Sequence, residues 1–163
     1  SGESYTFHGR YIYAYTGAKL AAGKISFEEV GPLVSLDDLE TIHHPKPKAT
    51  TTSVTGNIDI LDVRFGNLWT NIDRELFVST NITHGDLLEV AIHNNEGQVY
   101  KNAMTYGRSF ADSRLGEPLI YVNSVDKLGV AINQGSFAKA YNIGTGANWK
   151  ITIRKINSRA KAV

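Results

Sequence analysis

The sequence predicts a mainly β protein, a small antiparallel β-barrel preceded by an N-terminal helical segment. Short apolar runs rich in β-branched residues recur after residue 50, turn residues separate them, and a helical period appears only near the start of the chain. Antiparallel strands this closely spaced usually bury their edges by closing into a barrel or a sandwich. We therefore expect 49–163 to form the barrel and 1–48 to be a helical segment with a linker.

The first element expected is a helix over 9–23, "GRYIYAYTGAKLAAG". Ile12, Tyr15 and Leu20, together with the alanines, give a mostly helical period, and Gly23 is placed to end it.

A second, shorter helix is predicted over 35–42, "SLDDLETI", because Ser35 stands in the N-cap position and Asp38 follows three residues later as an imperfect capping box. In 43–53, "HHPKPKATTTS", two prolines and a polar run favour a connection or an edge strand over a packed helix. The boundary between the two parts of the chain is placed there.

The rest of the chain reads as strands and turns. The Asn-Asn-Glu-Gly run 94–97 predicts a hairpin turn in which Gly97 supplies a positive φ, and 123–126 predicts a second turn. A short helix is expected over 134–141. The expected strands are 54–63, 87–93, 98–106, 118–124, 127–133 and 148–156.

Composition excludes several classes of function. A net charge of +1 gives no overall field to attract nucleic acid or an anionic membrane, and the absence of cysteine excludes disulfides and thiolate metal sites. No apolar run reaches the roughly 18 residues of a membrane-spanning helix, and the first residues lack a signal pattern. His43 and His44 are adjacent, so on a strand they would point to opposite faces and not to one metal. We expect a cytoplasmic protein that binds no metal, membrane or nucleic acid.

Two polar residues near the Gly66 turn are candidates for ligand binding. Asn67 carries a carboxamide that can donate and accept at once, as recognition of a base edge or an amino-acid head group requires. The alternative is a tight turn, since Gly and Asn dominate turns. Asp62 lies in an otherwise apolar strand near the same turn, where a half-buried carboxylate needs a partner. That partner is either Arg64 or the ammonium of a ligand.

Two further candidates lie in later loops. Phe110, in "SFADS", could stack on a flat heterocycle or cap the core, and capping is commoner for aromatic residues. Ser124 follows Asn123 in a hairpin turn, and both default to turn chemistry. No pairing of a nucleophile with a base emerges from the sequence.

Three stretches of the sequence, taken in their order and spacing along the chain, resemble the motifs of one protein family. They are "TFHGR" with the following "AKLAAG", then "LDVRFGNLWTNI", then "IYVNSVDKLGVAINQGSFAKAY". Together they look like the C-terminal part of the S-adenosyl-L-methionine (SAM) hydroxide adenosyltransferases, hydrolases related to the bacterial fluorinase and chlorinase. The resemblance implies a two-domain enzyme, usually a homotrimer, with an α/β N-terminal domain and a β-barrel C-terminal domain. The ligand would lie between the barrel of one subunit and the N-terminal domain of its neighbour.

The resemblance also implies roles for single residues. Asp62 would accept from the methionine ammonium, Asn67 would bridge adenine and amino acid, and Phe110 would pack on the adenine ring. Ser124 would meet the methionine end of SAM. Phe7 and Gly9 would lie near the ribose carbon under attack.

Catalytic residues are not expected in this chain, because the water-activating Asp, Arg and His of the family belong to the N-terminal domain. The segment 1–48 would then be the end of that domain with a linker, and the chain alone would be inactive or nearly so. No cofactor is implied, since SAM is the substrate.

Departures from the family pattern bear on the nucleophile and on the ligand contacts. Gly9 replaces the fluorinase serine that contacts the halide, and His8 in place of tyrosine is closer to the hydrolases, so water is the expected nucleophile. Tyr11 stands where the hydrolases usually have aspartate, and Val125 stands where the halogenases have arginine. Ile132 and Gln134 differ from the halogenases near adenine. The alternatives are a chlorinase-like halogenase, a nucleoside-binding barrel without catalysis, and an oligonucleotide-binding barrel, the last suggested by topology alone.

Overall fold

The structure is a computed structural model that describes residues 7–41 and 44–156. The chain divides into two compact units, 1–42 and 43–163, a few residues before the expected boundary at residue 48.

The first unit contains the predicted helix. A π-helical stretch, η1 (Gly9–Ala14), runs directly into α1 (Tyr15–Ala21), and Gly23, with a φ of 63°, ends the helical region as predicted. No residue of η1 or α1 is buried. Its exposed large side chains include Tyr11, Ile12, Tyr13 and Tyr15.

The helix expected over 35–42 is reduced to one 3-10 turn, η3 (Leu36–Asp38), so this prediction was largely wrong. Ser35 does cap the turn, since its Oγ accepts from the Asp37 N–H, but Leu39 is already extended. A helix this short needs an apolar face packed on a partner, and none of these residues is buried. Another 3-10 turn, η2 (Glu28–Val30), precedes it.

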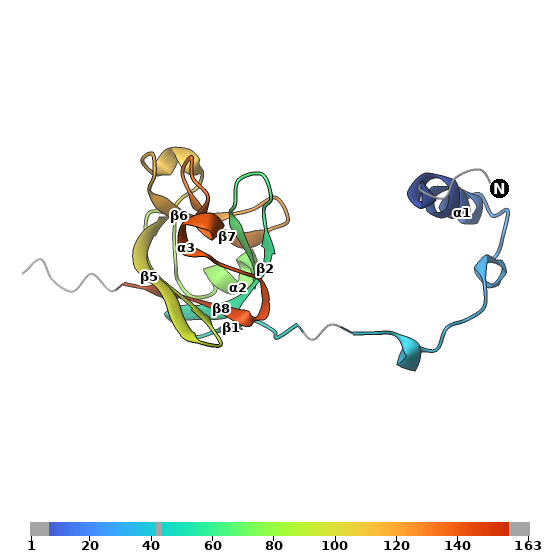
Figure 1. Cartoon of the computed structure of the whole chain (residues 1–163), viewed down its shortest axis with the longest axis horizontal. Coiled ribbons are helices and arrows are strands. Elements are labelled where there is room, and N and C mark those ends of the chain that lie inside the picture. The colour runs from blue at the N-terminus through green and yellow to red at the C-terminus, as the bar shows by residue number, and fades with distance from the viewer. Residues whose placement is uncertain (1–6, 42–43, 157–163) are drawn as a thin grey trace, which may run out of the picture. The chain divides into compact units, whose positions relative to one another are not determined.

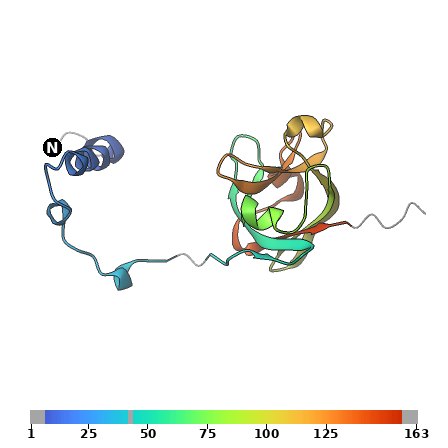
Figure 2. The ribbon, with the colours of Figure 1, turned by 180° about the vertical axis from the view of Figure 1, so that it is seen from behind.

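The second unit is a closed barrel of seven strands, which confirms the predicted fold class (Figures 1 and 2). Strands follow one another around the barrel in the order β2-β3-β7-β6-β5-β4-β8, and β8 pairs with β2 to close it. All these neighbours are antiparallel except β5 and β6, which are parallel. The strands are β1 (Lys48–Ala49), β2 (Ser53–Leu61), β3 (Leu68–Asp73), β4 (Leu87–Asn94), β5 (Gly97–Tyr106), β6 (Pro118–Val122), β7 (Lys127–Ile132) and β8 (Gly146–Lys155).

The expected turns and edges are present. β1 is a short edge strand beside β2, within the segment 43–53 for which a connection or an edge strand was predicted. Gly97, with a φ of 136°, closes the β4–β5 hairpin. Two helices, α2 (Arg74–Val78) and α3 (Phe137–Tyr141), complete the unit with the 3-10 turn η4 (Phe110–Asp112). α3 lies within the predicted helix 134–141, whereas β3 and α2 lie outside the predicted elements.

The core fills the barrel from alternate strand positions. In β4, Leu88, Val90 and Ile92 are fully buried while the residues between them are half-buried, as a period of two requires. Phe77 of α2 and Phe137 of α3 are also fully buried in the same cluster. In residues 7–41 and 44–156, no helix is long and apolar enough to cross a membrane.

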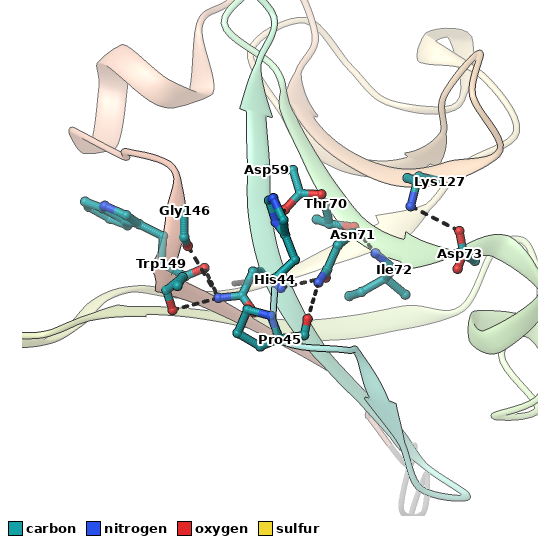
Figure 3. Close-up of polar contacts among 12 residues, drawn as sticks. His44, Pro45, Asp59, Thr70, Asn71, Ile72, Asp73, Lys127, Gly146 and Trp149 are labelled. Atoms are coloured by element: carbon teal, nitrogen blue, oxygen red, sulfur yellow. Dashed lines mark hydrogen bonds and ion pairs between the residues drawn. The ribbon is translucent and has the colours of Figure 1, made fainter. Parts of the chain in front are cut away.

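Buried amides hold the seam where β2 meets β8. The pairing shifts register after Asn57, whose Nδ2 donates to the main-chain oxygens of Ala147 at 2.9 Å and Trp149 at 3.2 Å. Asn71 Oδ1 accepts from the Asn57 N–H at 2.8 Å, and Asn71 Nδ2 donates to Pro45 O at 2.8 Å (Figure 3). The side chains thus satisfy main-chain groups that the interrupted ladder leaves unpaired.

Candidate functional site

A pocket of about 990 Å³ opens among the loops of the barrel. Its wall is built by the β2–β3 loop 62–67, by Phe110 of η4, by the end of β6 with the turn after it, and by 132–139, which leads from β7 into α3. A pocket of this size can accommodate a nucleoside-sized ligand.

The β2–β3 loop is held in shape by its own main chain and by α3. Asp62 N–H donates to Asn67 O at 2.9 Å, and Gly66 N–H donates to Asp62 O at 2.6 Å. Gly66 has a φ of 67°, and a Cβ there would overlap Ser136 Oγ, so only glycine fits this position. Ala138 N–H donates to Gly66 O at 2.9 Å, which ties the loop to the start of α3. The Gly66-Asn67 pair is therefore a turn, as the alternative interpretation proposed, and it also lines the pocket.

The Asp62 carboxylate is half-buried in the pocket wall. Its Oδ1 accepts from the main-chain N–H of Arg64 at 2.9 Å. Arg64 is thus a partner of Asp62 through its main chain, and among the described residues no ion pair joins its guanidinium to the carboxylate. The negative charge therefore remains available to a cationic group of a ligand.

Three buried polar atoms at the pocket make no well-formed hydrogen bond among the described residues: Asn67 Oδ1, Trp69 Nε1 and Asn123 Nδ2. The side chains of Asn67 and Trp69 do lie close enough to the Tyr121 hydroxyl to lower its pKa. Buried polar groups are nearly always paired, so each exception needs an explanation. At the pocket, the three atoms would offer a ligand one acceptor and two donors.

The side chain of Asn123 also stabilises the β6–β7 turn, as expected from the sequence. Its Oδ1 accepts from Val125 N–H at 3.1 Å and from Lys127 N–H at 3.0 Å, which fixes the β6–β7 turn. Ser124, the next residue, is exposed and lines the pocket. The turn therefore holds a hydroxyl and an amide donor at the pocket wall.

An aromatic pair borders the same pocket. The Phe110 ring is 37% exposed and lies 5.2 Å from the Tyr121 ring between centroids, so Phe110 borders the pocket and does not cap the core. Tyr121 lies against Gly129, where a Cβ would come within 2.7 Å of the ring. Burial raises the pKa of the Tyr121 hydroxyl against a smaller opposing effect of the adjacent Trp69 and Asn67 side chains, so the group stays neutral at physiological pH. A half-exposed ring face beside polar donors suits a flat heterocycle.

The structure thus brings four predicted site residues, Asp62, Asn67, Phe110 and Ser124, to one pocket. Their roles toward a ligand stay predictions. Phe7, which is exposed, and Gly9, which begins η1, belong to the first unit, and their proximity to the reacting carbon stays a prediction as well.

Two pocket residues carry signals that the sequence analysis did not use. Trp69 is two residues after Asn67, and such positions share a face of an extended strand. Asn123 was interpreted only as a turn residue. His43 lies outside the described residues, and His44 Nδ1 lies 4.0 Å from Asp59 Oδ1.

Comparison with known proteins identifies similar sequences and structures. The family described as SAM hydroxide adenosyltransferase C-terminal domain matches residues 56–150. A fluorinase from an Actinoplanes species is 34% identical over 149 residues, covering 90% of this chain and 48% of that protein. An (R)-S-adenosyl-L-methionine hydrolase from Thermus thermophilus is 31% identical over 145 residues, covering 89% and 48%.

A solved structure of an uncharacterized conserved protein from Thermotoga maritima superimposes with a TM-score of 0.70 at 30% identity. The superposition covers 94% of this chain and 54% of that one. The chain spans about half the length of the relatives it matches.

Proposed function

Because the chain belongs to the SAM hydroxide adenosyltransferase family, we propose that its barrel supplies the adenine- and methionine-binding wall of a SAM hydrolase. The reaction would convert SAM and water to adenosine and L-methionine. The observation that carries the proposal is the pocket itself, which brings Asp62, Asn67, Phe110 and Ser124 together and in which Asn67, Trp69 and Asn123 each have a buried polar atom without a well-formed hydrogen bond.

The chemistry of the wall fits the parts of SAM. The Asp62 carboxylate suits the ammonium of the methionine moiety, and the Phe110 face suits a purine. The unpaired Asn67 Oδ1 can accept from an exocyclic amine or an ammonium, and the Ser124 hydroxyl can donate to a carboxylate. Apolar side chains in the rest of the wall would limit access of competing water.

In the proposed reaction, the water oxygen bonds to the ribose 5′ carbon as the bond from that carbon to sulfur breaks. The electron pair of the broken bond stays on sulfur, so methionine leaves as a neutral thioether, and the water loses a proton to a base. Since a sulfonium is already an excellent leaving group, catalysis needs mainly alignment and an activated nucleophile. By resemblance, the residues that activate water belong to the N-terminal domain of the family, and the ligand would lie between two subunits of a cytoplasmic homotrimer.

Turnover and binding by the 163-residue chain test this proposal. We expect adenosine release from SAM no faster than in a protein-free control, because the barrel supplies only part of the site. Binding of SAM should show no saturation below roughly millimolar ligand, since half of the usual contacts are missing. Robust release of adenosine, or tight binding of SAM, would contradict the proposal that this chain supplies only part of the site. A complete lack of binding for both SAM and adenosine would reject the ligand class.

A halide in place of water is the second candidate, because two similar proteins are fluorinases, at 34% and 32% identity. The two reactions differ in product, which would be adenosine in one and a 5′-halogenated deoxyadenosine in the other. Gly9 and His8 favour water by the resemblance described above. Chromatography of the products formed with chloride or fluoride present, by a protein that joins this chain to a family N-terminal domain, decides between them.

A further inference from the structure

We propose that Lys139 supplies the positive charge that receives the carboxylate of the ligand's amino-acid moiety. The inference rests on the proposed function, because that carboxylate belongs to the methionine part of SAM. Its consequence is selectivity: the pocket should prefer SAM to its decarboxylated analogue, which keeps the adenosine, the sulfonium and the ammonium.

The charges along the pocket wall are the first observation. The wall contains the carboxylate of Asp62 and two cationic side chains, Arg64 and Lys139. In the part of the chain that the structure describes, no ion pair joins either cation to Asp62 or to another acid. Opposite charges that line one pocket without neutralising each other match a zwitterion, which brings an ammonium and a carboxylate together.

The second observation is that the main chain of Lys139 is fixed beside the loop that carries Asp62. Lys139 N–H donates to Ser136 Oγ at 3.3 Å, and its neighbour Ala138 donates to Gly66 O. Phe137, one residue earlier, is fully buried and anchors α3 in the core. The main chain at Lys139 is therefore held close to Gly66, which belongs to the same loop as Asp62.

The other wall residues are less suited to this role. Arg64 and Lys139 are both exposed, but Arg64 lies between Val63 and Phe65, which are 98% and 63% exposed, whereas Lys139 lies two residues after the fully buried Phe137. Val125, which follows Ser124 in the β6–β7 turn, is apolar and 56% exposed and offers no charge. The ammonium of Lys139 is in no ion pair among the described residues, and its main chain is held in place by hydrogen bonds and by the buried Phe137.

The test compares two ligands on two proteins. The unmodified chain and Lys139→Met, which keeps the length of the stem and removes the charge, are titrated with SAM and with decarboxylated SAM by NMR. We expect the unmodified chain to bind SAM about three- to tenfold more tightly than the analogue, as for a solvent-accessible charged pair. Lys139→Met should reduce this ratio to about one and leave the affinity for the analogue unchanged.

Lys150→Met is the matched control, because Lys150 is exposed on β8 and does not line the pocket. It should keep the ratio of the unmodified chain. The inference is overturned if Lys139→Met still prefers SAM to the decarboxylated analogue by the original ratio of affinities. It is also overturned if a further variant, Arg64→Gln, loses this preference while Lys139→Met keeps it. If neither compound binds to any of the proteins, the proposed function fails and the inference fails with it, whereas binding with an unchanged ratio rejects the inference alone.

Discussion

At the residue scale, the site depends on polar side chains at the pocket that still have a donor or acceptor available to a ligand. Among the described residues, Asp62 is the only acidic side chain at the pocket, and its contact there is with a main-chain N–H. Asn67, Trp69 and Asn123 each leave a buried polar atom unpaired. A buried unpaired group costs free energy, and a ligand that bonds to these atoms would offset part of that cost.

Replacing Asp62 by Asn should weaken SAM binding without unfolding the barrel. Asparagine keeps an oxygen that accepts from the Arg64 N–H and removes only the charge that would meet the ligand ammonium. We expect about a three- to tenfold loss of affinity in an NMR titration, with an unchanged circular dichroism spectrum. Glu96→Gln, in the β4–β5 turn away from the pocket, is the matched control. Equal affinities in all three proteins would reject the assignment of Asp62.

Tyr100 should make the free energy of unfolding depend on alkaline pH. Burial, with a smaller effect of Tyr141, raises the pKa of its hydroxyl from 10.0 to about 12 against an opposing effect of Asn102, and the hydroxyl makes no well-formed hydrogen bond among the described residues. Above pH 10 the unfolded chain loses this proton while the folded chain keeps it, so stability present below pH 10 is lost as the pH rises toward 12.

Tyr100→Phe should remove that part of the loss and, near pH 7, leave stability equal or raise it by roughly 1 kcal/mol, because an unpaired buried hydroxyl is deleted. Urea unfolding at pH 7, 10 and 11 measures both effects. The prediction fails if the variant loses stability with alkaline pH as steeply as the unmodified chain.

At the element scale, the β2–β3 loop and α3 act as one unit, since Gly66 packs against Ser136 and Ala138 bonds to Gly66 O. Through this contact, the loop that carries Asp62 and Asn67 and the helix that carries Lys139 line the same pocket. The sequence predicted the short helix and the turn separately, but local periodicity carries no information about which loop meets which helix. For the same reason, Lys139 was indistinguishable in the sequence from a solvated helix face.

Gly66→Ala should therefore destabilise the barrel and disturb the pocket. The substitution combines strain at a positive φ with an overlap on Ser136. Gly116→Ala, at a φ of 79° but with open space around it, provides the control for strain alone. We expect Gly66→Ala to cost about 1–3 kcal/mol more than the control in urea unfolding. Equal costs would show that the contact between the loop and α3 does not stabilise the fold.

The strand β3 shows why periodicity did not predict every element. Thr70 occupies the position between Leu68 and Ile72 where a period of two would place an apolar residue, and Asn71, out of phase with them, is buried as well. Each is satisfied by a main-chain oxygen, Thr70 Oγ1 donating to Leu128 O at 2.9 Å and Asn71 Nδ2 to Pro45 O. Those partners are distant in sequence, so the pattern of β3 could be understood only from the fold.

Asn57→Ala should weaken the closure of the barrel. Its side chain satisfies main-chain oxygens of β8 at the register shift, and alanine would leave them buried without a partner. The expected cost is about 1–3 kcal/mol in urea unfolding. Asn148→Ala, at an exposed position of β8, should cost much less, and equal costs would contradict the role of Asn57 at the seam.

At the scale of the whole molecule, closure joins segments that are far apart in the sequence. Ser53, at the start of β2, pairs with Arg154, near the end of β8. The strand pattern predicted a closed sheet, because an unpaired edge is a liability. The strand order and the parallel pairing of β5 with β6 required the structure, since local patterns do not specify which strands are neighbours. The candidate site followed from the resemblance to the family more than from any single residue.

The proposal that this barrel provides one wall of a SAM site is tested most directly by following the tryptophan indole N–H signals during titration with SAM. The chain has two tryptophans: Trp69 lines the pocket with its Nε1 unpaired, whereas Trp149 packs on Gly144 away from it. We expect the Trp69 indole and the side-chain amides of Asn67 and Asn123 to shift progressively into the millimolar range while the Trp149 indole stays in place. Signal shifts at Trp149 alone, or no shifts at Trp69, Asn67 and Asn123, would contradict the proposal that the barrel provides one wall of a SAM site.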